Sequence, residues 1–281
     1  MINTVLPAPF RPRMARPWWI RLRAAFAALV LCCGSLAAQR PDSLPSAATD
    51  SAARDTAVRA ARERVPANAH LVRWYEPLAV LGGIALTASL DESVANHFRD
   101  HRSQTGQDLA DAWAKVGTAG VGVVTAGVLA GGLISHNDKV THAGLRLLFS
   151  AAVAGGAVEG IKFVLGRERP LENTSAWDFD AGHADAAFPS GHTTLAFAMA
   201  ASLTDDIHRT WATVGLYGAA TGVAVARVYQ QEHWVSDVVG GAAVGIASAK
   251  LVSGRWRIFG LRPPGFLLTP AGASIEWHTS F

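Results

Sequence analysis

The sequence predicts an all-α protein, a compact bundle of about six core helices with a functional site at the helix ends. Half of the residues are hydrophobic, and they fall into runs rich in Ala, Val, Leu and Gly that are longer than most strands. Small residues let helices pack closely, in water or in lipid. The predicted helical runs are 76–90, 117–135, 143–165, 191–204, 209–226 and 236–252.

Residues 1–38 have the pattern of a secretory signal peptide. A basic segment ends at Arg23, and the apolar run AAFAALVLCCGSLAA then leads to small residues suited to cleavage. An uncleaved membrane anchor is the alternative interpretation, although the apolar run is short for a spanning helix. The only cysteines, Cys32 and Cys33, lie in this segment, so we expect no disulfide or thiol chemistry in the mature chain.

The basic character of the chain belongs to that leader. It contains five arginines and no acidic residue, and without it 20 basic residues remain against 22 acidic ones, a net charge of −2. Such a balance gives no support to a nucleic-acid partner.

Three further segments follow the leader. Residues 39–70, rich in Ala, Ser, Asp, Arg and Pro, are predicted to be a flexible linker. Residues 71–254 are predicted to be the helical domain, in which 91–116 serves as a connector. In the tail, 255–281, RIFGL and GFLLT are extended candidates and ASIEWHTSF alternates apolar and polar residues, which predicts one or two β-strands in a small hairpin packed on the bundle.

The run lengths bear on the location of the protein. Several runs have only about 14–16 residues, whereas about 20 are needed to cross a bilayer. The charges of Arg146, Glu159 and Lys162 also interrupt the third run. These features favour a bundle secreted to the cell envelope, periplasmic after signal cleavage, with a membrane-associated or integral bundle as the alternative.

The stretch KFVLGRERP at 162–170 carries the first set of candidate functional residues. Lys162 and Arg169 are seven residues apart, about two helical turns, so they can share one helix face. Arg167 lies between them and need not point the same way, and Pro170 is expected to end the helix. A basic helix end that stabilises the macrodipole is the simpler alternative.

The stretch FPSGHT at 188–193 carries the second set. Pro189 marks a turn, Ser190 is a candidate helix cap, and Gly191 permits a close approach of the backbone to another group. His192 follows in the first helical turn, where unpaired N–H groups favour an anion. An ordinary capping serine before a buried helix is the alternative.

The stretch ARVYQQEHWVSDVVGG at 226–241 carries the third set. His233 and Asp237 are four residues apart on one helix face, so the carboxylate can hold the imidazole. Arg227 offers a guanidinium fork for phosphate oxygens. A structural hydrogen bond near a helix start is the alternative. Together the three stretches supply three cations, two histidines and a helix N-terminus, which suit phosphoryl transfer without a metal.

In this order, the signatures Lys–six residues–Arg-Pro, Pro-Ser-Gly-His and Arg–five residues–His–three residues–Asp resemble the type-2 phosphatidic acid phosphatase and vanadium haloperoxidase superfamily, which includes bacterial acid phosphatases. Three ordered motifs are far more specific than any one alone. The chain departs from the pattern at Ala226, where the family usually has a serine. Loss of that hydroxyl would cost about 1–2 kcal/mol of phosphate binding.

The resemblance implies a role for each matching residue. His233 would be the nucleophile that forms a phosphohistidine, Asp237 would orient it, and His192 would be the general acid and then the base. The resemblance also implies that no metal is needed and that vanadate inhibits. The implied phosphate-binding residues are Lys162, Arg169, Ser190, Gly191 and Arg227.

In membrane members of this superfamily the motif loops usually face the periplasm. Here a cleaved leader followed by spanning runs would place the first motif in the cytoplasm, because it ends the third run. This conflict is a further reason to favour a secreted bundle.

The loop 171–188 joins the first two motifs and has polar and aromatic residues. Trp177 and Phe179 are candidates to contact the leaving group of a substrate. A polar loop over the site is favoured over a metal site, because no matching ligands occur elsewhere. The residues considered for a metal are Asp178, Asp180, His183 and Asp185.

The predicted function is therefore that of a metal-independent phosphatase. Phosphatidic acid, undecaprenyl diphosphate and small organic phosphates are the candidate substrates, and the sequence does not choose among them. A vanadate-dependent haloperoxidase, with vanadate as cofactor, and a non-catalytic helical envelope protein are the alternatives.

Overall fold

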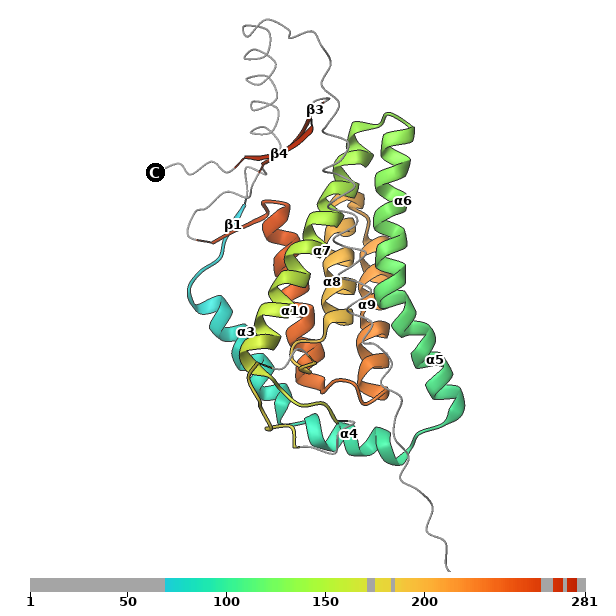
Figure 1. Cartoon of the computed structure of the whole chain (residues 1–281), viewed down its shortest axis with the longest axis vertical. Coiled ribbons are helices and arrows are strands. Elements are labelled where there is room, and N and C mark those ends of the chain that lie inside the picture. The colour runs from blue at the N-terminus through green and yellow to red at the C-terminus, as the bar shows by residue number, and fades with distance from the viewer. Residues whose placement is uncertain (1–68, 171–174, 183–184, 259–264, 270–271, 277–281) are drawn as a thin grey trace, which may run out of the picture. The chain divides into compact units, whose positions relative to one another are not determined.

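Figure 1 shows the computed structural model, which describes residues 69–170, 175–182, 185–258, 265–269 and 272–276. The predicted signal peptide and almost all of the predicted linker lie outside the described residues. His70, the last residue of the linker, lies in a short strand. The domain boundaries stay predictions.

The described part of the chain is all-α, as predicted. Its short strands come before the first described helix and after the last one. Each predicted helical run corresponds to a helix. The helices are α3 (Tyr75–Ala88), α4 (Asp91–Asp100), α5 (Gln104–Lys115), α6 (Val121–Ile134), α7 (Asp138–Leu165), α8 (Gly191–Ile207), α9 (Thr210–Tyr229) and α10 (Val235–Val252), and a π-helical turn, η2 (Val116–Gly120), joins α5 to α6.

The segment 91–116, expected to be a connector, instead contains α4 and α5. The first turn of α4 carries Asp91 and Glu92 and its last turn carries Arg99, an arrangement that suits the helix dipole. At the start of α5, Ser103 accepts a hydrogen bond from the backbone N–H of Gly106 at 3.1 Å. Both helices therefore have ordinary start signals that apolar run length alone does not detect.

Four of the helices, α7, α8, α9 and α10, are longer than their predicted apolar runs. Helix α7 has 28 residues, about 42 Å, and begins at Asp138, before its apolar run. It continues through Arg146, which pairs with Asp206 of α8. Three helical segments of the described chain are long and apolar enough to cross a membrane: 104–134, α7 and α10. A fourth arises if α3 and α4, bent by 43°, count as one span. The argument from short runs is therefore wrong.

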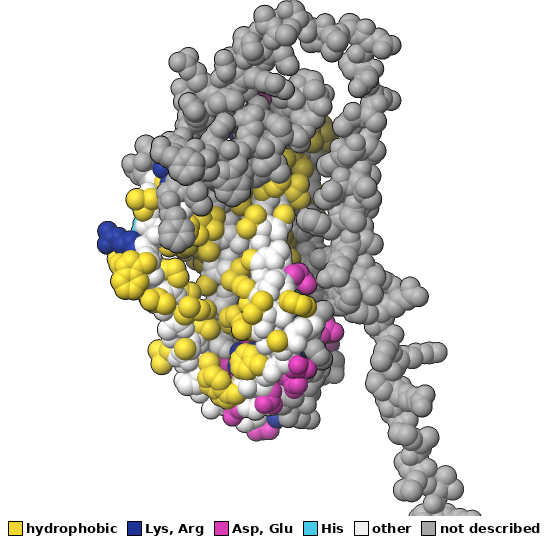
Figure 2. Space-filling model, turned by 60° about the vertical axis from the view of Figure 1, so that its left-hand side comes forward, with side chains coloured by type: hydrophobic (Ala, Val, Ile, Leu, Met, Phe, Trp, Pro, Cys, Tyr) yellow, Lys and Arg dark blue, Asp and Glu magenta, His cyan; other side chains and the backbone are white. Residues whose placement is uncertain are grey.

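The surface of the helical unit agrees with a membrane environment. Large apolar side chains are exposed on several helices, such as Leu86 on α3, Ile134 on α6 and Val164 on α7. Figure 2 shows hydrophobic side chains over much of the described face turned to the viewer. Together with the three long apolar helices, this surface supports membrane association.

Helix α8 is the centre of the bundle and packs against α7, α9 and α10. Its alanines meet those of α9 in a core that contains Ala196, Ala200 and Ala220. Helix α10 approaches α8 so closely that a Cβ on Gly245 would lie 2.3 Å from the carbonyl oxygen of Thr194. Small residues thus fix the spacing of the helices that carry the predicted motifs.

The directions of the helices gather these motifs at one end. The chain runs down α7 and α9 toward the end at which α8 and α10 begin, and α4 crosses that same end (Figure 1). The C-terminal ends of α7 and α9 and the N-terminal ends of α8 and α10 are therefore neighbours.

The strands are short. β1 (His70–Leu71) pairs in parallel with β2 (Trp256–Arg257), with His70 opposite Trp256. β3 (Gly265–Thr269) and β4 (Gly272–Glu276) pair with each other and fall mostly in a separate compact unit. The extended tail is confirmed, while its packing on the bundle stays a prediction.

Candidate active site

The first motif leaves the helix earlier than expected. Helix α7 ends at Leu165 because Gly166 adopts a left-handed conformation with φ of 60°. A Cβ on Gly166 would lie 1.7 Å from the carbonyl oxygen of Asp180, so only glycine fits there. Lys162 is therefore in the last helical turn and Arg169 is beyond it. The prediction that they share a helix face, and that Pro170 ends the helix, is wrong.

Arg169 nevertheless meets the third motif. Its Nη1 donates to Glu232, and Nη2 of Arg227 lies 3.3 Å from the same carboxylate oxygen. Arg227 comes from the last turn of α9 and also donates to Gln230 at 2.6 Å. One carboxylate thus bridges the two guanidinium groups that were predicted to bind phosphate. Sequence reasoning missed Glu232, although it lies inside the motif.

The second motif starts α8 at Gly191, as expected, but Ser190 does not cap the helix. In the described structure its side chain makes no capping bond. Its Oγ accepts from Thr193 Oγ1 at 3.0 Å, and its backbone N–H donates to the carbonyl of Asp237 at 3.1 Å. This bond ties the start of α8 to α10. The nearest described atom to a Cβ on Gly191 would be 3.8 Å away, so the protein itself makes no close approach there.

His233 lies in the turn between α9 and α10 and is almost fully buried. Its Nδ1 is 3.7 Å from Asp237 Oδ2, which is too long for a hydrogen bond, and no described residue hydrogen-bonds to this nitrogen. Asp237 Oδ2 instead accepts from the backbone N–H of Trp234 at 2.8 Å. The predicted pair is in contact but not yet bonded, as is common before a substrate binds.

The cations of the first and third motifs act on both histidines. Burial, and then the charges of Arg227 and other neighbours, lower the pKa of His192 to about 3. Burial, and then the same arginine, also lowers the pKa of His233 well below its usual value. Lys162 and Arg169 contribute to both shifts. The structure thus brings together the three predicted cations and two neutral histidines at the N-terminus of α8.

Arg167 turns away from this cluster. It is buried and hydrogen-bonds to Asp237, Ser236 and Asp91. Neither Asp91 nor Ser236 was predicted as a site residue. Asp91 lies far away in the sequence, and its only signal is an acidic residue in the first turn of a helix.

The loop between the first two motifs is described in part. Trp177 and Phe179 are exposed, 63% and 51%, which leaves them accessible to a substrate. Asp178 accepts from the backbone of Ser175, and Asp185 lies 3.9 Å from Arg169. His183 lies outside the described residues. Among the described residues no group of three His, Cys, Asp or Glu could hold a metal, and metal independence stays a prediction.

The comparisons with known proteins agree with this arrangement of motifs. Residues 143–257, from α7 to β2, match the family model of the PAP2 superfamily. The matched segment is similar to the PAP2 superfamily over less than half of the chain, and it holds all eight predicted site residues.

Two curated relatives are similar to part of the chain. One is the lipid A 1-phosphatase of Porphyromonas gingivalis, 37% identical over 107 residues, which covers 37% of this chain and 21% of the relative. The other is the putative undecaprenyl-diphosphatase YbjG of Escherichia coli K12, 29% identical over 122 residues, which covers 41% of this chain and 60% of the relative. The chain therefore spans less than two thirds of each.

Two solved structures are also similar, each at 21% identity. One is a transmembrane PAP2-type phosphatidylglycerolphosphate phosphatase from Bacillus subtilis, with a TM-score of 0.45 over 64% of this chain and 95% of that one. The other is LpxE from Aquifex aeolicus, with a TM-score of 0.44 over 58% of this chain and 94% of that one.

Proposed function

We propose that the protein is a membrane-associated phosphatase that hydrolyses a phosphate ester carried by a lipid, through a phosphohistidine intermediate and without a metal. One observation carries the proposal: the buried His233 and the half-buried His192, both of lowered pKa, share one end of the bundle with three cations and a helix N-terminus. Fixed cations and N–H donors stabilise the charge of a transferring phosphoryl group.

In the first step a ring nitrogen of His233 attacks phosphorus. The bond from phosphorus to the ester oxygen breaks, its electron pair goes to that oxygen, and His192 donates the proton that the leaving alcohol needs. Water then attacks the phosphohistidine, His192 takes a proton from it, and the phosphorus–nitrogen bond breaks to return the electron pair to His233. Inorganic phosphate and the alcohol are the products.

His192 must gain a proton before it can act as an acid. Burial, and then the neighbouring cations, lower its pKa and so favour the neutral form. A bound phosphate dianion offsets those positive charges, so it raises the pKa of His192 and favours the protonated form. Substrate binding and acid activation are thereby coupled.

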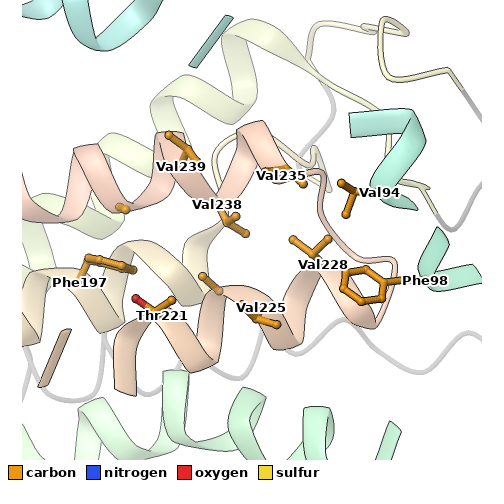
Figure 3. A pocket seen from close by; sticks show the side chains of 11 residues that line it. Val94, Phe98, Phe197, Thr221, Val225, Val228, Val235, Val238 and Val239 are labelled. Carbon is orange, nitrogen blue, oxygen red and sulfur yellow. The ribbon is translucent and has the colours of Figure 1, made fainter. Parts of the chain in front are cut away.

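An apolar groove near the third motif supports a substrate with a hydrocarbon chain. A cavity of about 330 Å³ lies between α9 and α10, with Phe197 of α8 at one end and Val94 and Phe98 of α4 at the other (Figure 3). Every wall of this cavity is apolar apart from Thr221. Val228 and Val235 line it, and these residues flank the turn that carries His233.

The membrane-compatible surface and the named activities of the curated relatives, on lipid A and undecaprenyl diphosphate, agree with a lipid substrate. The same phosphoryl chemistry would act on a soluble phosphate ester, but such a substrate has no hydrocarbon chain to occupy the groove.

The test is hydrolysis of p-nitrophenyl phosphate and of phosphatidic acid in mixed micelles by the full chain. We expect turnover that survives EDTA, is inhibited by vanadate and disappears in His233→Ala. Halide oxidation with added vanadate and peroxide, in place of phosphate release, would contradict the proposal and favour the haloperoxidase.

A pair of variants tests the groove. Val225→Trp fills it, whereas Val214→Trp places the same side chain elsewhere on α9, outside the groove. We expect Val225→Trp alone to lower kcat/KM for phosphatidic acid by about tenfold or more and to leave p-nitrophenyl phosphate unaffected. Equal losses on both substrates would contradict a role in lipid binding.

A further inference from the structure

A buried network joins α4 to the catalytic carboxylate. Arg167 Nη1 donates to Asp237 Oδ1 at 2.6 Å, and Nη2 donates to Asp91 Oδ2 at 2.7 Å. The side chains of both aspartates are fully buried, and that of Arg167 is 4% exposed. One guanidinium group therefore holds the first residue of α4 against the first turn of α10.

All five N–H donors of Arg167 are used. Nη1 also donates to Ser236 Oγ at 2.6 Å, while Nε and Nη2 donate to the carbonyl of Ala176 at 2.9 and 2.7 Å. A guanidinium held on every donor has one orientation, so the position of the Asp237 carboxylate is fixed with it.

Asp91 also binds the first turn of α10 directly. Its Oδ1 accepts from the backbone N–H of Ser236 at 2.8 Å, and its Oδ2 accepts from Ser236 Oγ at 2.5 Å. Ser236 precedes Asp237, so the Asp91 carboxylate fixes both the arginine and the backbone on which Asp237 stands.

The charges in this network are unequal. One guanidinium lies between two carboxylates near the His233 ring, so with both carboxylates ionised the network carries one net negative charge. Buried excess charge is costly unless a partner compensates it. In the proposed reaction His233 gains positive charge as it bonds to phosphorus, and that charge would compensate the network.

We propose that Asp91 is a positioning residue for the reaction, acting through Arg167 and Ser236 to hold the Asp237 carboxylate against His233. This inference rests on the proposed phosphatase activity. It places a functional residue on α4, outside the segment 143–257 that matches the superfamily.

Asp91→Asn tests the role, because it keeps the size of the side chain and removes its charge. We expect kcat for p-nitrophenyl phosphate to fall about 10- to 100-fold. A loss of this size is typical when a residue that orients a reactive group through hydrogen bonds is replaced. KM and the inhibition constant for vanadate should change less than twofold, because the phosphate-binding cations are untouched. A purely structural residue would affect binding and turnover together.

Glu92→Gln is the matched control. Glu92 is the next residue of α4 and accepts only from the loop, at Ser175 Oγ and the N–H of Ala176, among its described contacts. Its kcat should stay within twofold of the wild-type value.

If Asp91→Asn does not fold, Ser236→Ala decides. It removes the hydroxyl that accepts from Arg167 and donates to Asp91, and it keeps the charges of Asp91, Arg167 and Asp237. We expect a severalfold loss of kcat with vanadate binding retained. Wild-type kcat in the folded variant, or equal losses of kcat and vanadate affinity, would overturn the role of Asp91. A wild-type protein without turnover would instead defeat the proposed function itself.

Discussion

At the scale of single residues, Glu232 occupies the guanidinium groups that a phosphate would need. Its carboxylate bridges Arg169 and Arg227, so substrate has to displace it. Glu232→Gln removes the competing charge, and we expect KM and the vanadate inhibition constant to fall about fivefold, equivalent to about 1 kcal/mol.

Steady-state kinetics with vanadate inhibition measures this effect. Asp185→Asn is the control. The Asp185 carboxylate is exposed and lies 3.9 Å from Arg169, too far for a hydrogen bond. This substitution should therefore change neither KM nor the vanadate inhibition constant. Unchanged or weaker vanadate binding in Glu232→Gln would show that the carboxylate orients the arginines rather than competing for them.

The two histidines predict a pH dependence of stability. Their pKa values are lowered in the folded protein, to about 3 for His192, and lie near 6.5 in an unfolded chain. The unfolded state therefore binds more protons below pH 6.5, so the free energy of unfolding falls as the pH drops from 6.5 toward 3. Above pH 6.5 these groups contribute no slope.

Thermal unfolding in detergent between pH 7 and pH 4 tests this, with His192→Asn as the comparison. The variant should lose less stability on acidification than the wild type. The same pH slope in both proteins would contradict the lowered pKa of His192.

The sequence predicts the site residues better than their contacts. The motif spacing identifies His192, His233 and Arg227, because each lies at a helix end that the chain direction brings to the site. Contacts that cross the fold could not be foreseen. Arg167, to which the sequence assigned no direction, binds Asp91, 76 residues away in the sequence.

At the scale of elements, the turn after α7 positions the first motif. Gly166→Ala would place a Cβ in a left-handed residue that already touches the Asp180 backbone. We expect a loss of at least about 1–2 kcal/mol of stability and a lower kcat/KM, because Arg169 follows this turn.

Gly160→Ala, in the same helix, is the control. No described atom lies within 4 Å of a Cβ there, and alanine favours helix, so its melting temperature should not fall. Equal melting temperatures for the two variants would contradict the argument.

The sequence predicted that helices form in the long apolar runs, but it did not predict the lengths of those helices. Apolar runs located six of the helices, but the ends of the runs differ by a few residues from the ends of the helices. In α7 the charge of Arg146 is met by Asp206 of a neighbouring helix, which the sequence of α7 alone cannot show. Helix α4 was missed because its apolar face is short, with Val94 and Phe98 one turn apart.

At the scale of the whole molecule, the helix directions define two ends of the bundle. Helix α7 runs from Asp138 to the site, and α10 runs from the site to Val252. If both span a membrane, residues near 137 and 253 lie across the bilayer from the site, and the β1–β2 pairing places His70 on that same side. A periplasmic site then places His70 on the cytoplasmic side of the membrane.

Cysteine labelling in intact cells tests this topology, in a background that lacks Cys32 and Cys33. With a periplasmic site, a membrane-impermeant maleimide should label Ser175→Cys directly and Ser135→Cys only after the membrane is permeabilised. Labelling of both cysteines in intact cells would contradict a membrane-spanning bundle and would support a secreted protein.

The most direct test of the central claim is capture of the phosphoenzyme. Wild-type protein mixed with a ³²P-labelled phosphate ester and quenched in alkali within milliseconds should carry an alkali-stable, acid-labile phosphate on His233. The label should be absent from His233→Ala. Turnover by the wild type with no such label, or a label that survives in His233→Ala, would contradict the mechanism.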